Sequence, residues 1–411
     1  MTADAAAQGG APDPGSGAGV WLIALGQTIG YVTQTFAFAA LIVALNDPVT
    51  GAALPAAILA AGPTLGLLIA AALAPLSGRL VDSGQGARLL TFGPLFSAAG
   101  LAVAALGEGR AAVWLLGFAL IGLGQATTQF ETCFAFLTRR LGHRARRAII
   151  RVTLVAGFST TLAFPLGDAL ARTFGWQGAL LSLAVMQLVL TVPLNHAATR
   201  LIRRQSGVDR ADKRPADGNG RLSATLRQPG FWQLGGLLAL VWLNHAVLST
   251  FALPVLIDRG AAQDIAVMLA AALGPAQVAG RLMLVMAGDR IPLRALTLWV
   301  LSGFVLGALV LLLGRGIPTF WLIYALVQGA AAGIASILRP LLAADILGRD
   351  GFGAVWGVLS VAPLLAQAAA PVLGAGLMLL GGAPLVIAAC LAMAVAALGL
   401  GLILRPRISS G

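Results

Sequence analysis

Glu131 is a carboxylate inside a long apolar segment, where a charge costs about 2.5–3.5 kcal/mol on insertion scales. It stands eight residues before Arg139, which corresponds to about 12 Å at the helical rise of 1.5 Å per residue. An acid at this depth could load and release a proton, as intramembrane acids of pumps do. We therefore expect Glu131 to couple protons to the activity. The alternative is a structural ion pair or a hydrogen bond between helices.

Arg281 is the expected positive partner of Glu131, and it also lies in an apolar segment. A guanidinium is a planar fork that holds a carboxylate with two hydrogen bonds, so Arg281 would suit an anionic substrate. A gating salt bridge or a loop charge that sets topology is the alternative. Gln277, one turn earlier, shares the face of Arg281. We expect Arg151 and Arg339, nearer the inner ends of their segments, to be structural.

Polar side chains form stripes on two further segments. In the first segment they recur at i, i+4, i+7 and i+8, which places them on one helical face. Such a face has to meet a water-filled cavity or other helices, and we favour the cavity. In the seventh segment His245 could switch its protonation or only donate a hydrogen bond. The predicted substrate-binding residues are Gln27, Tyr31, Gln34, Asn244, His245, Gln277, Arg281 and Gln328.

The elements that position these residues are membrane-spanning helices. Apolar residues make up 58% of the 411 residues and charged residues 10%, whereas soluble domains have about 45–50% and 25%. At roughly 20 residues per span, this suffices for about a dozen spans. Twelve apolar runs begin near Val20, Leu54, Leu89, Ala112, Ile149, Ala179, Phe231, Ile265, Leu296, Phe320, Ala354 and Pro384.

The spans divide into two halves of six. A basic segment, 200–230, separates a bundle over 19–199 from a bundle over 231–405, and 1–18 and 406–411 are expected as tails, the first of them disordered. Leu141-Gly142 precedes Pro165 by the same spacing as Leu347-Gly348 precedes Pro371, with an offset of 206 residues. Equal halves with an internal repeat are typical of transporters whose substrate site lies at the midplane.

The basic residues predict the orientation. With the N-terminus inside, the outer loops hold only four of the 27 Lys and Arg residues, and the other 23 lie on the inner side. This bias predicts a multi-pass protein of the inner (plasma) membrane with both termini cytoplasmic. The same bias accounts for the basic cluster at 139–147, so this cluster need not bind a ligand. Met1 to Ala18 has no basic n-region, so we expect no signal peptide.

The loop Gly78-Arg79-Leu80-Val81-Asp82-Ser83-Gly84-Gln85-Gly86-Ala87-Arg88 resembles the loop signature of the major facilitator superfamily. The resemblance implies an all-α integral membrane fold with twelve helices in two pseudo-symmetric bundles, and a gating loop that includes Gly78, Asp82 and Arg88. Ser83 replaces the usual basic residue.

Two further stretches are similar to the monocarboxylate and oxalate/formate branch: the segment from Arg139 through Gly157 to Ala179, and Gly274 to Arg281. In carboxylate transporters of that branch an aspartate often stands where this chain has Gln277.

Other function classes lack their motifs. The chain has no phosphate-binding Gly-x-x-x-x-Gly-Lys-Ser/Thr, no His-Glu-x-x-His and no Cys-x-x-Cys, so we expect neither an enzyme nor a metal or cofactor. Its net charge of +12 lies in loops between apolar runs, which disfavours nucleic acid as a partner. Cys133 and Cys390 are expected in the core.

We expect a monomeric secondary active transporter in the lipid bilayer. Its substrate would be a small organic solute, such as a monocarboxylate anion, and its coupling ion a proton. A drug or neutral-metabolite exporter of the same fold is the alternative, and an integral-membrane enzyme or receptor is disfavoured.

Overall fold

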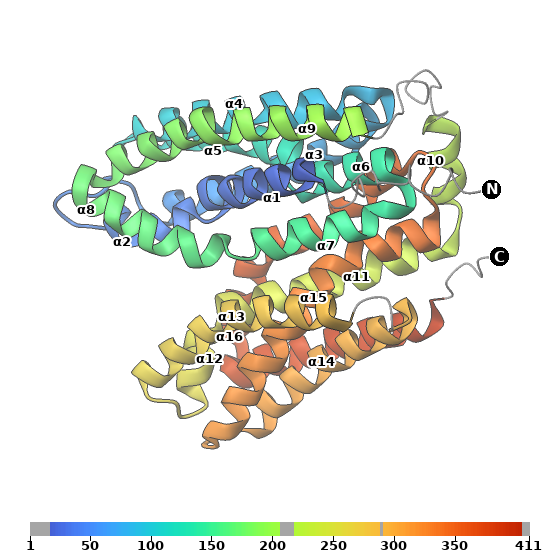
Figure 1. Ribbon diagram of the computed structural model, residues 1–411. Coiled ribbons are helices and arrows are strands. Elements are labelled where there is room, and N and C mark those ends of the chain that lie inside the picture. The colour runs from blue at the N-terminus through green and yellow to red at the C-terminus, as the bar shows by residue number, and fades with distance from the viewer. Residues whose placement is uncertain (1–16, 206–217, 288–290, 405–411) are drawn as a thin grey trace, which may run out of the picture.

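The computed structural model describes residues 17–205, 218–287 and 291–404, and within these ranges the chain is helical with no strand (Figure 1). The tails expected at 1–18 and 406–411 lie outside this part of the chain, apart from Gly17 and Ala18, the second of which begins the first helix. The all-helical fold expected from the sequence is therefore confirmed.

The first half of the chain forms the upper layer of Figure 1. Its elements are α1 (Ala18–Gly30), η1 (Tyr31–Thr35), α2 (Ala37–Leu45), α3 (Ala56–Leu80), η2 (Val81–Gln85), α4 (Gly86–Ala105), α5 (Ala111–Thr128), α6 (Phe130–Leu141), η3 (Gly142–Arg144), α7 (Ala145–Ala156), α8 (Ser159–Met186), η4 (Gln187–Thr191) and α9 (Val192–Gln205).

The second half forms the lower layer, apart from α10, which Figure 1 shows at the right beside α6. Its elements are α10 (Gly218–Leu226), α11 (Pro229–Thr250), α12 (Ala252–Asp258), α13 (Gln263–Ala287), α14 (Leu293–Leu313), α15 (Pro318–Leu347) and α16 (Phe352–Ile403).

Nine segments of the described chain are long and apolar enough to cross a membrane. Three of them have 50, 60 and 52 residues, about twice the length that one crossing needs. Each of these contains a glycine with a left-handed backbone, Gly84, Gly175 or Gly382, where the chain changes direction. A double crossing of each would give the twelve spans that the sequence predicts.

Side-chain amides join the helices of the first half. The Gln27 Nε2 donates to the carbonyl of Thr128 at 2.6 Å, and Asn195 Nδ2 donates to the carbonyl of Leu90 at 2.8 Å. Because lipid offers no partner to an amide, these bonds fix neighbouring spans against each other.

The second half uses the same device. Asn244 donates to the carbonyl of Cys390 at 2.7 Å, and Gln328 donates to the Asn244 Oδ1 at 2.9 Å. These residues lie on α11, α15 and α16, so three spans are joined through a single buried amide. Each half is consequently a bundle held together by its own polar contacts.

The two copies of the Leu-Gly repeat have the same local structure. Gly142 ends α6 with a φ of 56°, and Gly348 ends α15 with a φ of 87°. Both values lie in the left-handed region that favours glycine, which explains why this residue stands at both helix ends.

The segment predicted as a linker, 200–230, contains more helix than its composition indicates. Helix α9 continues to Gln205, and α10 occupies Gly218–Leu226. Leu222 is buried and the Trp232 indole donates to the carbonyl of Leu226 at 2.9 Å, so these contacts pack α10 against the bundle. Residues 206–217 of this segment lie outside the described part.

Candidate functional site

A break inside the fourth span places Glu131 at a helix end. Helix α5 ends at Thr128, Gln129 has an extended backbone, and Glu131 lies in the first turn of α6. The first turn exposes backbone N–H groups and the positive end of the helix dipole, which favour a carboxylate. The chain thus places an acid in the middle of a span at a point where its charge is stabilised.

Glu131 forms an ion pair across the two halves. Its Oε1 lies 2.5 Å from the Nη2 of Arg339 on α15, and both side chains are largely buried. The sequence predicts Arg281 as this partner and a structural role for Arg339, whereas the structure pairs Glu131 with Arg339. The repeat explains the pairing, because Glu131 stands ten residues before Leu141 and Arg339 eight before Leu347. The two residues therefore lie at similar depths in equivalent spans.

Two tryptophans enclose the guanidinium of Arg339. Its Cζ lies 5.4 Å from the ring centroid of Trp242 and 5.1 Å from that of Trp356, within range of cation–π attraction. The Trp356 indole also donates to the carbonyl of Glu131 at 3.0 Å. Neither tryptophan was predicted from the sequence, although both lie in spans close to polar residues.

Arg281 is the second buried cation of this region. It is 8% exposed, and its Nε donates to the Ser336 hydroxyl at 3.3 Å. Among the described residues no carboxylate lies within ion-pair distance of Arg281, and Ser336 is its only hydrogen-bond acceptor. Its Nη1 reaches Gly157, the residue that follows α7 in the first half, where any side chain would overlap with it.

Tyr31 and His245 complete the cluster. Tyr31 lies within electrostatic range of Glu131, Arg339 and Arg281, and its ring packs on Phe130 with centroids 4.5 Å apart. The His245 ring packs edge-on against Trp242 at 5.9 Å, and Ser249 Oγ lies 3.4 Å from its Nδ1.

We use the name central cluster for these groups from both halves. It consists of Tyr31, Glu131, Trp242, His245, Arg281, Arg339 and Trp356.

The predicted amides lie elsewhere. Gln27, Gln34, Asn244 and Gln328 are at most 4% exposed, and their NH₂ groups bond to neighbouring helices of the same half. The polar stripe of the first span therefore meets other helices at these positions, which was the alternative to a cavity. Gln277 is half-buried one turn before Arg281. A substrate-binding role for these five residues stays a prediction.

The halves also meet at the end of the helices that we call the basic side, where Arg79, Arg88, Arg139 and Arg349 lie. Asp82 of η2 accepts hydrogen bonds from the backbone N–H groups of Gly353 at 2.9 Å and Ala354 at 2.7 Å, in the first turn of α16. The Arg139 guanidinium donates to the Asp82 carbonyl.

Two predicted gating residues, Gly78 and Asp82, thus lie at one contact. Arg88 does not, because it points from α4 into a separate hollow.

We predict that Gly78→Ala opens the basic side. A Cβ at Gly78 would overlap with the carbonyl oxygen of Gly353, and both atoms belong to closely packed helices that cannot yield. Spin labels at Ser83 and Asp350, both exposed, should move apart in this variant. Gly376→Ala is the matched control, since no atom lies within 4 Å of a Cβ there. Equal label distances in both variants would contradict the prediction.

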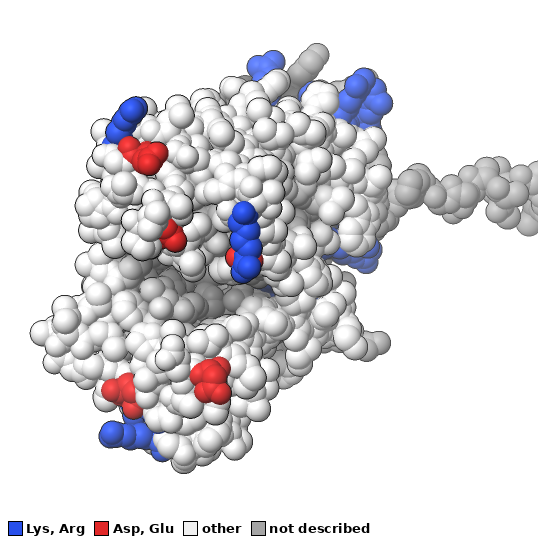
Figure 2. All heavy atoms as spheres, turned by 90° about the vertical axis from the view of Figure 1, so that its left-hand side faces the viewer, with Lys and Arg blue, Asp and Glu red and all other residues white. Residues whose placement is uncertain are grey.

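The opposite face of the molecule is hollowed between the two halves (Figure 2). The exposed residues Thr35 and Ser249 lie between Glu131 and this face. Gln129 donates a hydrogen bond to the Thr35 hydroxyl at 2.7 Å. The basic side is closed by the contact between α3 and α16, so the hollow lies on the face opposite to this closed side.

No protein-family model and no curated protein matches the chain. Solved structures do match. The major facilitator superfamily proton:xylose symporter XylE superposes with a TM-score of 0.73 at 15% identity, over 94% of this chain and 96% of its own. The human organic anion transporter MFSD10 gives 0.69 at 17% identity, over 93% and 99%. A bacterial homologue of the iron transporter ferroportin, in an outward-facing state, gives 0.70 at 13% identity, over 94% and 98%.

These matches confirm the fold predicted from the sequence. The chain has the fold of the major facilitator transporters and is a multi-pass helical membrane protein.

Proposed function

We propose that this chain is a secondary active transporter of the major facilitator superfamily that moves a small organic anion by alternating access. The observation that supports the anion most directly is Arg281, a buried guanidinium that touches both halves and has no described carboxylate within ion-pair distance. A buried charge without a partner is costly, so a bound anion would offset that cost. One structural neighbour is an organic anion transporter, which agrees with this substrate class.

The anion would lie between Arg281 and Tyr31. Arg281 uses one of the five N–H donors of a guanidinium on Ser336, which leaves its fork to hold a carboxylate with two hydrogen bonds. The aromatic residues Trp242 and Trp356 lie on the adjoining side of the cluster and would pack against the organic part of the substrate. Within this class we propose monocarboxylates as the preferred substrates, because the segments 139–179 and 274–281 resemble the monocarboxylate and oxalate/formate branch.

Proton coupling would act through Glu131. A proton on its carboxyl group removes the charge that Arg339 pairs with, and this pair joins the two halves. Loss of the pair frees α6 and α15 to separate, so protonation and the opening of the basic side become linked. One structural neighbour, XylE, is a proton symporter, which agrees with this ion.

The structure would then be the state that is open to the outside, with the basic side in the cytoplasm. This orientation rests on the excess of Lys and Arg on the closed side. A substrate would enter through the hollow of Figure 2 and leave after the contact of Asp82 with α16 has opened.

Flux measurements in proteoliposomes test this proposal. Labelled monocarboxylates, dicarboxylates, their neutral amides and a cationic drug are compared, each with and without an imposed pH gradient. We expect a monocarboxylate to be accumulated against its gradient when the pH gradient is present, and its amide to be excluded. Transport of the amide or the drug in place of the acids would favour the neutral-solute exporter and contradict the anion. Absence of flux for every class would contradict a transporter.

A further inference from the structure

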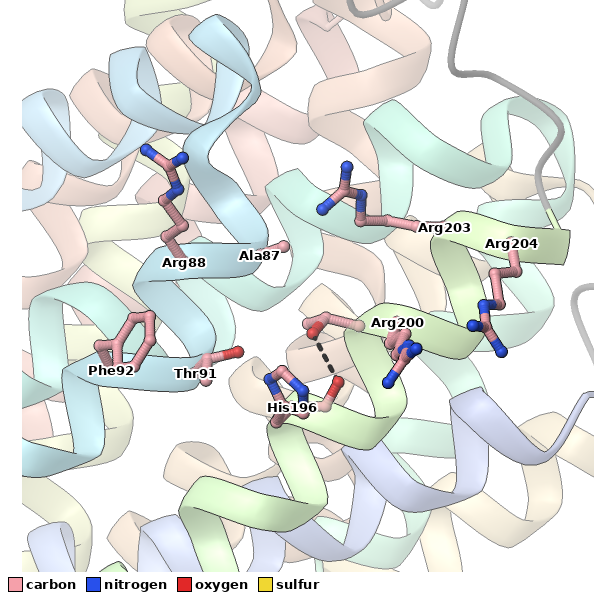
Figure 3. A pocket seen from close by; sticks show the side chains of 9 residues that line it. Ala87, Arg88, Thr91, Phe92, His196, Arg200, Arg203 and Arg204 are labelled. Atoms are coloured by element: carbon pink, nitrogen blue, oxygen red, sulfur yellow. Dashed lines mark hydrogen bonds between the residues drawn. The ribbon is translucent and has the colours of Figure 1, made fainter.

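A second group of basic side chains surrounds a hollow far from the central cluster. The cavity has a volume of about 420 Å³ and lies between α4 and α9 on the basic side (Figure 3). None of the residues that line it is acidic. Its cationic and imidazole side chains are Arg88, His196, Arg200, Arg203 and Arg204.

The two walls of the hollow are held in a fixed geometry. The bond from Asn195 to the Leu90 carbonyl ties α9 to α4, and Asn195 is fully buried. Thr199 donates to the carbonyl of His196 at 3.1 Å, so this hydroxyl is engaged within α9. The hollow is therefore a built feature of the packed helices.

The basic residues of α9 lie on one face of this helix. His196, Arg200 and Arg204 follow at intervals of four residues, and Arg203 stands seven after His196, so all four share one face. Figure 3 shows Arg88 of α4 across the hollow from Arg203. Like charges at this spacing destabilise a helix, and the general excess of basic residues on this side does not require them to converge on one cavity. Convergence of this kind indicates an anion.

The surface next to the hollow is apolar. Phe92 and Phe96 lie one and two turns beyond Arg88 on α4 and are 56% and 47% exposed. Leu188 and Val189, in the η4 turn that leads into α9, are also exposed. These side chains point away from the protein on the stretch that adjoins the basic residues, so the ligand needs a charged head and an apolar body.

We propose that this hollow binds the headgroup of an anionic phospholipid. The phosphate lies among Arg88, Arg200 and Arg204, and the acyl chains lie along Phe92 and Phe96. Basic pockets between membrane helices on the cytoplasmic side are suited to such headgroups. The site shares no residue with the central cluster, so it stands whether or not the proposed transport activity is correct.

Native mass spectrometry of the purified full chain tests this site. The probes are dioleoyl phosphatidylglycerol, dioleoyl phosphatidylcholine and soluble glycerol 3-phosphate. We expect phosphatidylglycerol to be retained on the wild-type protein and the other two not. The double variant Arg200→Gln/Arg204→Gln should weaken this binding by about 10- to 30-fold, the loss expected for two arginines at an anionic membrane surface.

Arg144→Gln/Arg294→Gln is the matched control, since it removes the same charge from exposed positions of the same side that do not line this hollow. Equal losses in both double variants would overturn the proposal, because the effect would then be one of net charge. Binding of glycerol 3-phosphate as tightly as the lipid would also overturn it, in favour of a soluble phosphate.

A second measurement uses the wild-type chain alone and so does not depend on the folding of a variant. Phosphatidylglycerol with a photoreactive acyl chain is expected to label peptides that contain Phe92, Phe96 or Val189. Labelling confined to other helices would overturn the proposal.

Discussion

Glu131→Gln should abolish substrate accumulation driven by a pH gradient, to the level of protein-free vesicles. Glutamine has nearly the same shape as glutamate, but its amide does not bind a proton near neutral pH and does not carry the charge that pairs with Arg339. Exchange of labelled for unlabelled substrate needs no net proton movement, so we expect it to continue. The measurement is uptake with and without a pH gradient beside exchange at equal pH.

Glu108→Gln is the matched control for this variant. Glu108 is exposed near the hollowed face, where it accepts a hydrogen bond from Gln177 at 3.1 Å. The control should retain accumulation. If Glu131→Gln accumulates substrate as well as the control does, Glu131 is a structural residue and another group couples the proton.

Arg281→Gln should weaken the apparent affinity for an anionic substrate by about 10- to 100-fold. A hydrogen bond to a charged group is worth about 1.5–3 kcal/mol, and 1.4 kcal/mol corresponds to a factor of ten. Arg281→Lys keeps the charge but loses the planar fork, so its affinity should lie between those of Arg281→Gln and the wild type. The concentration dependence of initial uptake measures this effect.

Thermal unfolding without substrate separates a binding role of Arg281 from a structural one. Removing a buried cation that lacks a described carboxylate partner should leave the melting temperature unchanged or raise it. Arg339→Gln should lower it, because this change leaves Glu131 buried and unpaired. Arg294→Gln, at an exposed position, controls for the loss of positive charge. A lower melting temperature for Arg281→Gln with unchanged affinity would contradict the binding role.

The fold was predictable because it depends on patterns that continue over many residues. Apolar runs of about 20 residues, separated by basic loops, permit few other structures than membrane spans. The start predicted near Pro384 for the twelfth run agrees with the structure, since Gly382, just before it, has the left-handed backbone of a turn. The helical α10 in the predicted linker was missed because nine residues provide too little pattern.

The candidate site was only partly predictable. Glu131 and Arg281 were identified because a charge in an apolar run is unusual in itself. The partner of Glu131 could not be read from local sequence, since it depends on how the halves face each other, although the repeat offset of 206 residues pointed to the region of Arg339. The amides of Gln27 and Asn244 were predicted to bind substrate, whereas they bond to neighbouring helices. A periodic pattern shows which residues share a helical face but does not show whether this face meets a cavity or another helix.

The buried amides have a mechanical consequence. Those of Gln27, Gln34, Asn244 and Gln328 join helices of one half and do not cross to the other. Each half should therefore rotate as a rigid body during transport, without movement of one helix relative to another within it. An antibody fragment bound in the opening of Figure 2 would then stop transport without touching Glu131 or Arg281, because two rigid halves cannot close around a bound protein.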